Sequence, residues 1–368
     1  MRTALVASKW FDICNGLECV EHFELEQPTV ILIGSGRRQQ EVLDYCLKEG
    51  LEVIQLLDPD LYSWYVAPKL NSALLKGFLF PFIFAITYAY WHVAWFCNQR
   101  LMRDKRFPTV IFDMWRTKCA VLPDLRPDRV FVIDGGYSTL ALGLLDSWTK
   151  GNLQETVKTY LDNQAKHQVA RRGEQPLGLR LTRSLYSRAF YTLPRRIRSR
   201  LKKAIVKLSD DPILFSSYSE SNRSSGKVHN AYNRSKALMG SKPVGAWVLI
   251  IGHPEFRTLA ESIEELAKVG TSVDGNILYL FHPRDRELMR KSSEIERLFE
   301  DRIEALGFRV CTSGLTLEHF LLRESQLPSA IVLYPSSSLK WLERVLPEDT
   351  SLLRVKISNS PQILNANP

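Results

Sequence analysis

Short apolar runs alternate with helical patterns along most of the chain, and this alternation limits the possible folds more than any other feature. Strands separated by helices form right-handed βαβ units, in which the strands lie parallel in one sheet. Two series of such runs are visible, one in each half of the sequence. The expected strands are Thr3–Ser8, Thr29–Gly34, Leu51–Leu56, Thr109–Phe112 and Arg129–Asp134, then Ala246–Gly252, Asn276–Phe281, Phe308–Cys311 and Ala330–Tyr334.

Helical patterns fall between several of these strands, notably over Gly16–Phe23, Arg38–Lys48, Thr258–Val269 and Lys291–Leu306. The sequence therefore predicts an α/β protein with two Rossmann-like domains. Their parallel sheets are expected to face a cleft between the domains, which is the natural place for a ligand.

The two series are separated by segments of different composition. Ser209–Pro243 is rich in Ser, Asn, Lys and Gly, which predicts a linker or a long loop. A last strand-like run, Leu352–Ile357, lies in a C-terminal tail. The expected parts are an N-terminal domain over 1–165, a basic segment over 166–208, a linker over 209–244, a C-terminal domain over 245–345 and a tail over 346–368.

The cysteines indicate a reducing compartment. They stand at positions 14, 19, 46, 97, 119 and 311, without a Cys-x-x-Cys pair. This spacing argues against a zinc site and against a secreted disulfide framework. Met1–Ser8 predicts a short apolar strand rather than a signal peptide, because no cleavage site follows it. We therefore expect a cytoplasmic protein.

The net charge of +9 is concentrated in one segment. Lys166–Lys207 holds 13 Lys or Arg residues and one acid, Glu174, so the rest of the chain carries 36 basic and 39 acidic residues, a net charge of −3. A nearly neutral globule with one cationic segment argues against a broad nucleic-acid-binding surface.

Two segments suggest contact with a membrane. Gly77–Cys97 has no charged side chain and approaches the length of a bilayer span, but Pro81, His92 and scattered aromatic residues leave three alternatives open. It is a membrane span, a monotopic contact or a core helix. The 166–208 segment predicts a basic amphipathic helix, which suits either anionic lipid or packing on its own domain. We expect a peripheral contact with the inner face of the cell membrane, because both segments, 77–97 and 166–208, can take part in it.

Gly34-Ser-Gly36 follows an expected strand and opens a helix, as a dinucleotide-binding fingerprint does. The position of the third glycine is occupied by Gln39. An ordinary strand-to-helix turn is therefore favoured.

A carboxylate marks the end of one expected strand. In Phe131–Thr139, an apolar run ends at Asp134 and two glycines, Gly135 and Gly136, then allow a sharp turn. A carboxylate at the carboxyl end of a parallel strand can accept a proton from a sugar hydroxyl. The alternative is that Asp134 caps the following helix or turn.

A histidine follows the end of another expected strand, Asn276–Phe281. In Tyr279–Arg286, His282 and Pro283 follow the strand, and Arg284 and Arg286 stand close by. A histidine beside two guanidinium groups suits a phosphate. A purely structural histidine is the alternative.

Three serines follow a third strand end. Pro335 begins a turn, and Ser336, Ser337 and Ser338 precede an expected helix over Lys340–Val345. Hydroxyls and free backbone N–H groups at a helix start bind phosphate, although ordinary N-capping by serine gives the same pattern.

The order Asp-x-Gly, His-Pro and Ser-Ser resembles the bacterial sialyltransferases, which are inverting enzymes of the two-domain GT-B class. Two further segments are similar to the lipooligosaccharide sialyltransferase branch and the related polysialyltransferases. They are Ile13–Val20, after the first strand, and Leu249–Pro254, in which a strand ends in a Gly-His-Pro turn.

The resemblance implies roles for particular residues. Asp134 would be the general base, and His282 would assist the departure of cytidine monophosphate. Ser336 and Ser337, or Ser337 and Ser338, would hold the donor phosphate. Gly135 replaces the second acid of the first motif, so Glu255 remains a second candidate for the base. Donor-binding positions would also include Gly252, Pro283 and Arg284.

The resemblance further implies a CMP-sialic acid donor, a cell-surface glycan acceptor, and neither a metal nor a separate cofactor. The N-terminal domain would hold the acceptor and the C-terminal domain the donor. Three alternatives stay open: transfer from another CMP-sugar such as Kdo, a non-catalytic membrane-associated member that binds nucleotide or glycan, and a GT-B enzyme that uses a different nucleotide sugar.

Overall fold

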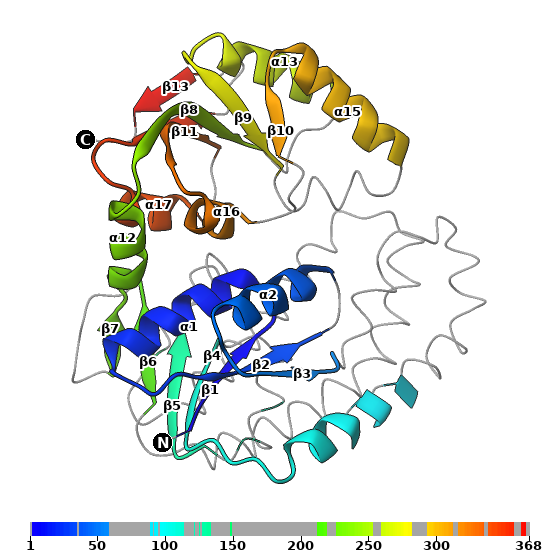
Figure 1. Cartoon of the computed structure of the whole chain (residues 1–368), viewed down its shortest axis with the longest axis vertical. Coiled ribbons are helices and arrows are strands. Elements are labelled where there is room, and N and C mark those ends of the chain that lie inside the picture. The colour runs from blue at the N-terminus through cyan, green and yellow to red at the C-terminus, as the bar shows by residue number, and fades with distance from the viewer. Residues whose placement is uncertain are drawn as a thin grey trace. The chain divides into compact units, whose positions relative to one another are not determined.

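The computed structural model divides into two compact units, Met1–Asn230 and Ala231–Pro368, which are drawn in Figure 1. The structure describes residues 2–34, 37–58, 89–90, 92–94, 96–113, 121, 125, 127–133, 148, 212–218, 226–252, 259–281, 293–311, 316–334, 338–356 and 362–365.

The first unit contains a parallel sheet in the order β3-β2-β1-β4-β5-β6-β7. The order reverses at β1, so the topological switch point lies between β1 and β4. The strands are β1 (Thr3–Ala7), β2 (Thr29–Ile33), β3 (Val53–Leu56), β4 (Thr109–Asp113), β5 (Arg129–Ile133), β6 (Ile213–Ser216) and β7 (Lys227–His229).

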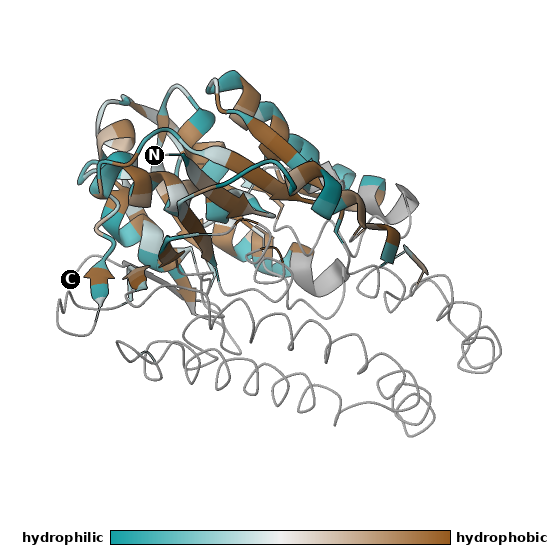
Figure 2. Ribbon diagram, turned by 90° about the horizontal axis from the view of Figure 1, so that it is seen from below, coloured by the Kyte–Doolittle hydropathy of each residue, from teal (hydrophilic) through white to brown (hydrophobic). Residues whose placement is uncertain are grey.

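Two helices pack on this sheet. α1 (Trp10–His22) contacts β1, β4 and β5, and α2 (Arg37–Lys48) contacts β2 and β3. Every residue of β1, β2 and β4 is buried, which explains why these strands are continuous apolar runs in the sequence instead of alternating ones. Figure 2 shows the strands as mainly hydrophobic, whereas the helices carry residues of both kinds.

The second unit repeats the strand order of the first. Its sheet runs β10-β9-β8-β11-β12-β13, and all neighbours are parallel except β12 and β13. The switch point lies between β8 and β11. In chain order the elements are α12 (Asn233–Gly240), β8 (Val244–Ile251), α13 (Leu259–Gly270), β9 (Asn276–Leu280), α15 (Ser293–Ala305), β10 (Arg309–Cys311), α16 (Leu317–Arg323), β11 (Leu327–Leu333), α17 (Leu339–Val345), β12 (Ser351–Lys356) and β13 (Gln362–Asn365).

The central strand β8 shows why this unit needs helices on both faces of its sheet. Leu249 and Ile251 join an apolar cluster with α12, α16 and α17, while Val248 and Ile250 join a second cluster with α13 and α15. Side chains alternate between the two faces of a strand, so each face contributes to its own core. The unit is a doubly wound α/β sheet.

These findings confirm the predicted fold of two Rossmann-like units with parallel sheets. Every strand expected from the sequence is present, with ends that differ by a few residues. The helix expected at Gly16–Phe23 was placed too late, because α1 begins at Trp10, directly after β1.

The 209–244 stretch is not the plain linker that its composition suggested. Its described residues include β6, β7, α12 and the first residue of β8, and the division between the units falls after Asn230. Polar composition misled here because both strands are short and β7 is only half-buried. The 346–368 tail likewise contributes β12 and β13 to the second sheet.

Of the two segments expected at a membrane, 166–208 lies outside the described residues. Within 77–97, residues 89–90, 92–94 and 96–97 are described and are helical. Across the ranges that the structure describes, no helix combines the length and apolar character that crossing a membrane requires.

Candidate functional site

Three of the motifs identified in the sequence follow strands that are neighbours in the second sheet. Gly252 comes directly after β8, His282 comes two residues after the end of β9, and Ser336 lies between β11 and α17. In the sheet these strands stand in the order β9-β8-β11, on both sides of the switch point. Ligands of open α/β sheets bind beside the carboxyl ends of strands at such a point.

Gly252 and Ser338 are the two expected site residues that the structure describes. The other expected site residues lie outside the described ranges, and they are Asp134, Glu255, His282, Pro283, Arg284, Ser336 and Ser337. Their roles therefore remain predictions.

Gly252 ties the ends of two strands together. Its buried backbone N–H donates a hydrogen bond of 2.8 Å to the carbonyl oxygen of Leu280, the last residue of β9. The ladder between β8 and β9 thus continues to the carboxyl edge of the sheet, where both strands end.

Ser338 begins α17 and faces a carboxylate from α16. Its hydroxyl donates a hydrogen bond of 2.6 Å to Oε1 of Glu318, and no backbone group of α17 accepts or donates a capping bond to that side chain. Glu318 is 7% exposed and belongs to the first turn of α16. Glu318 was not among the residues expected from the sequence. The available signal was its place in the first turn of a helix that follows a strand, which puts a carboxylate at the carboxyl edge of the sheet.

His319 is the next residue along α16 and is also buried. Burial, and secondarily the positive charge of Arg323, lowers the pKa of His319 to about 4. The imidazole is therefore neutral at pH 7. It adds no positive charge beside Glu318.

In the first unit, β5 ends at Ile133, so Asp134 is the first residue after the strand. The neighbouring strand β4 ends in another acid, Asp113, which is buried and pairs in register with Ile133. The sequence predicts that this strand ends at Phe112, and for that reason Asp113 was not among the expected site residues. Two neighbouring strands of the sheet thus lead into carboxylates at or beyond their carboxyl ends.

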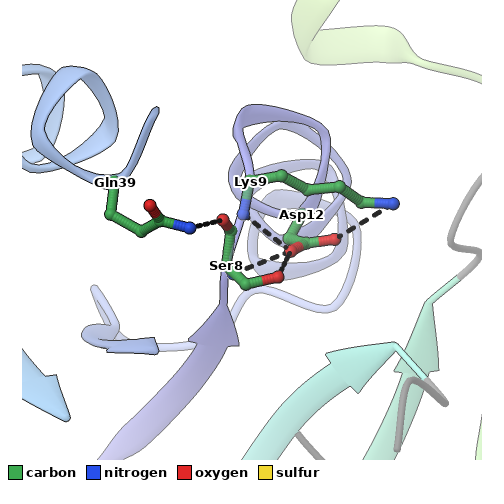
Figure 3. A network of polar contacts seen from close by, with 4 residues as sticks. All are labelled: Ser8, Lys9, Asp12 and Gln39. Atoms are coloured by element: carbon green, nitrogen blue, oxygen red, sulfur yellow. Dashed lines mark hydrogen bonds and ion pairs between the residues drawn. The ribbon is translucent and has the colours of Figure 1, made fainter. Parts of the chain in front are cut away.

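The end of β1, beside the switch point, is held by a polar network (Figure 3). Oδ2 of Asp12 accepts the backbone N–H groups of Ser8 and Lys9 at 2.8 and 3.1 Å, and the Ser8 hydroxyl at 3.4 Å. The Lys9 ammonium lies 3.9 Å from Oδ1 of the same carboxylate. Asp12 has no exposed surface, so it fixes the turn from β1 into α1.

Gln39 extends this network from α2 and packs beside Gly34. Its Nε2 donates to the Ser8 carbonyl oxygen at 3.2 Å, and its side chain lies 3.3 Å from the place of a Cβ at Gly34. Gly34 itself has a φ of +103°, which favours glycine. Gly34 follows β2 rather than the switch-point strand β1. Residues 35 and 36 lie outside the described residues, so the ordinary turn stays a prediction.

Among the residues that the structure describes, no three His, Cys, Asp or Glu side chains are grouped so as to hold a metal ion.

Comparison with known proteins gives structural similarity alone. No protein-family model matches the chain, and no curated protein matches its sequence. The glycosyltransferase VinC in complex with dTDP is 12% identical, with 98% of this chain and 82% of that chain covered and a TM-score of 0.40. Phytolacca americana UGT2, complexed with UDP-2-fluoro-glucose and pterostilbene, is 11% identical over 96% of this chain and 80% of that chain, with a TM-score of 0.42.

A third similar structure is Acinetobacter baumannii MurG, which is 9% identical over 92% of this chain and 73% of that chain, with a TM-score of 0.33. At these values the fold assignment depends on the strand order and pairing described above.

Proposed function

We propose that this chain is a GT-B glycosyltransferase that transfers sialic acid, or a related nonulosonic acid, from its CMP-activated form to a glycan acceptor with inversion. The observation that carries the proposal is the strand order of the second unit. The segments of the Gly-His-Pro, His-Pro and Ser-Ser-Ser motifs begin after β8, β9 and β11, which are neighbours on both sides of the switch point. Residues far apart in sequence thus follow strands that end at one edge of one sheet.

The proposed reaction is a single displacement at the anomeric carbon. Asp134 accepts the proton of the acceptor hydroxyl while the hydroxyl oxygen attacks that carbon. The bond from the carbon to the phosphate oxygen breaks, and its electron pair leaves with CMP. His282 and Arg284 neutralise the phosphate, and His282 can donate a proton to it. Attack opposite the leaving group inverts the configuration.

A buried acid at the edge of the first sheet supports a base in that unit. Asp134 follows β5 directly, and the neighbouring strand β4 ends in the buried carboxyl group of Asp113. Glu255 follows the Gly252 turn and is the second candidate for this role.

The test is release of CMP from CMP-sialic acid and from CMP-Kdo, with identification of the product by mass. Asp134→Asn and His282→Ala should each lower kcat by roughly 10²-fold or more, as loss of a general acid or base does. Asp128→Asn is the matched control, because Asp128 is an exposed acid at the opposite, amino end of β5 and pairs with Arg106. Unchanged turnover in both site variants, with normal folding, would contradict the proposal.

A non-catalytic member of the same fold is the second candidate, because Gly135 stands in place of an acid. Calorimetry with CMP, UDP, GDP and dTDP separates the possibilities. Binding of CMP without transfer or hydrolysis would favour the non-catalytic reading. Tighter binding of UDP, GDP or dTDP would favour a GT-B enzyme for a different nucleotide sugar.

The proposal includes contact with the inner face of a membrane through 77–97 and 166–208. In the helical residues at and after the end of the first segment, Val93, Phe96 and Leu101 are 56%, 64% and 51% exposed. Arg100 and Arg103 are exposed beside them, and cations next to apolar side chains suit anionic headgroups. Sedimentation with anionic vesicles should exceed that with zwitterionic ones, and equal recovery would contradict this part.

A further inference from the structure

We propose that Lys9 is a specificity-determining residue of the first unit: its ammonium group binds a carboxylate or phosphate group carried by the acceptor glycan. This inference rests on the proposed function and adds to it that the acceptor is anionic. The strand order of the first sheet, the exposure of Lys9 and the contacts of its side chain support it.

Lys9 lies at the carboxyl edge of the first sheet, two residues after the end of β1. β1 borders the switch point, and ligands of open α/β sheets bind beside the strand ends there. The neighbouring strand β4 ends in Asp113, and β5 leads into Asp134, the proposed base. Because only β4 separates β1 from β5, the ends of β1 and β5 lie roughly 10 Å apart. An oligosaccharide whose hydroxyl group contacts Asp134 can therefore extend to Lys9.

Among the described residues of the first unit, Lys9 is the one lysine or arginine within two residues after the carboxyl end of a strand. Arg2, Arg129 and Lys227 stand at the opposite edge, because they precede or begin β1, β5 and β7. The acids at the ends of β4 and β5 would repel a negatively charged ligand, and a cation beside them offsets that repulsion. At the strand ends that the structure describes, Lys9 supplies this cation.

The Lys9 side chain is exposed and yet held in place. It is 44% exposed, whereas Asp12 beside it has no exposed surface. Its nitrogen lies 3.9 Å from Oδ1 of Asp12, an ion pair drawn in Figure 3, and 5.9 Å from the centre of the Phe11 ring. A carboxylate and an aromatic face both attract an ammonium group, so the two contacts restrict where this charge can stand before a ligand arrives.

The buried Asp12 carboxylate is stabilised chiefly by other groups. Its Oδ2 accepts hydrogen bonds from the N–H groups of Ser8 and Lys9 and from the Ser8 hydroxyl. The 3.9 Å contact with the Lys9 ammonium is too long for a hydrogen bond, and an ion pair with one exposed partner adds little to stability. Replacing the Lys9 side chain should therefore change ligand binding while the turn from β1 into α1 stays folded.

The test measures binding to the full chain by calorimetry with two pairs of probes. Lactose is compared with 3′-sialyllactose, which adds a carboxylate, and galactose with galactose 6-phosphate. The wild type should bind the charged member of at least one pair about tenfold more tightly, as expected for a hydrogen bond between charged groups. In Lys9→Met this gain should disappear, while the neutral probes bind as before. The pair with the larger gain from Lys9 identifies the anion as a carboxylate or a phosphate.

Two variants are matched controls. Lys9→Arg keeps the charge and should keep the preference for the charged probe. Lys48→Met removes an exposed lysine from the last turn of α2, in the same unit, and should also keep it. Phe11→Leu removes the ring beside the ammonium group and should reduce the gain about threefold. Added salt should reduce the gain in the wild type, because the ammonium group is exposed.

Two results would overturn the inference. One is equal affinity of the wild type for the charged and the neutral member of both pairs, and the other is a gain that persists in Lys9→Met. Lys9→Gln repeats the measurement with a second uncharged side chain and decides the matter if Lys9→Met does not fold. No probe contains a nucleotide, so a lack of turnover of CMP-sialic acid would contradict the proposed function alone, and the binding of these probes would still judge Lys9.

Discussion

Gly16 on α1 lies so close to Leu5 on β1 that a Cβ at position 16 would stand 2.2 Å from Cδ1 of Leu5. Leu5 is fully buried in β1, an interior strand of the first sheet, and cannot move aside without disturbing its neighbours. The absence of a side chain at Gly16 therefore sets the distance between helix and sheet.

Gly16→Ala should lower the free energy of unfolding by about 1–3 kcal/mol through overpacking, although alanine is the better helix former. Urea denaturation followed by circular dichroism measures the change. Gly240→Ala, at the end of α12, is the control, because no atom lies within 4 Å of a Cβ there. If Gly16→Ala were as stable as the wild type, the close approach would not constrain α1.

Asp12→Ala should destabilise the first unit by about 1–3 kcal/mol, because the N–H groups of Ser8 and Lys9 lose a buried acceptor. Asp128→Ala removes an acid whose partner, Arg106, is equally exposed, and it should change stability by less than about 1 kcal/mol. Chemical denaturation of both variants makes the comparison. Equal effects would show that burial of the Asp12 carboxylate contributes nothing.

Lys242→Met should destabilise the second unit by about 1–3 kcal/mol. The ammonium group donates to the carbonyl oxygens of Leu321, Leu322 and Glu324 at 2.8, 2.7 and 2.6 Å, where α16 ends. Methionine has a similar length but no donor, so the three oxygens lose this partner. Lys236→Met, at an exposed position of α12, is expected to stay within about 0.5 kcal/mol of the wild type. Thermal unfolding of the two variants would contradict the prediction if their midpoints were the same.

Acidification should destabilise the protein through His319, whose pKa lies near 4 in the folded state against 6.5 for an unperturbed histidine. Between these two values the unfolded chain binds a proton that the folded chain does not, so stability falls as pH falls. The loss from this group is roughly 2 kcal/mol between pH 7 and pH 5. His319→Gln should flatten the dependence over that window, whereas His22→Gln, at an exposed position, should not. An unchanged slope in His319→Gln would refute the assignment.

The fold was predictable where burial on both faces makes a strand apolar throughout. β1, β2 and β4 are of this kind, and the helical patterns between strands then imply parallel pairing. β6 and β7 escaped notice because a strand of three or four residues near the sheet edge offers too few buried positions to form a pattern. The start of α1 was misplaced for a different reason: its first turn is joined to β1 by the Asp12 carboxylate, which no periodicity reveals.

By itself, the amino-acid sequence determined the two α/β halves, most of the strands in their sheets and the motif segments that follow those strands, because apolar periodicity and turn residues are local properties. Only the tertiary structure decided which strand ends are neighbours and which partner a polar side chain takes. Glu318 and Ser338 are 20 residues apart in the chain, yet one hydrogen bond joins them. Such a bond depends on how two helices pack over a shared core, and the spacing of residues along the chain does not contain that information.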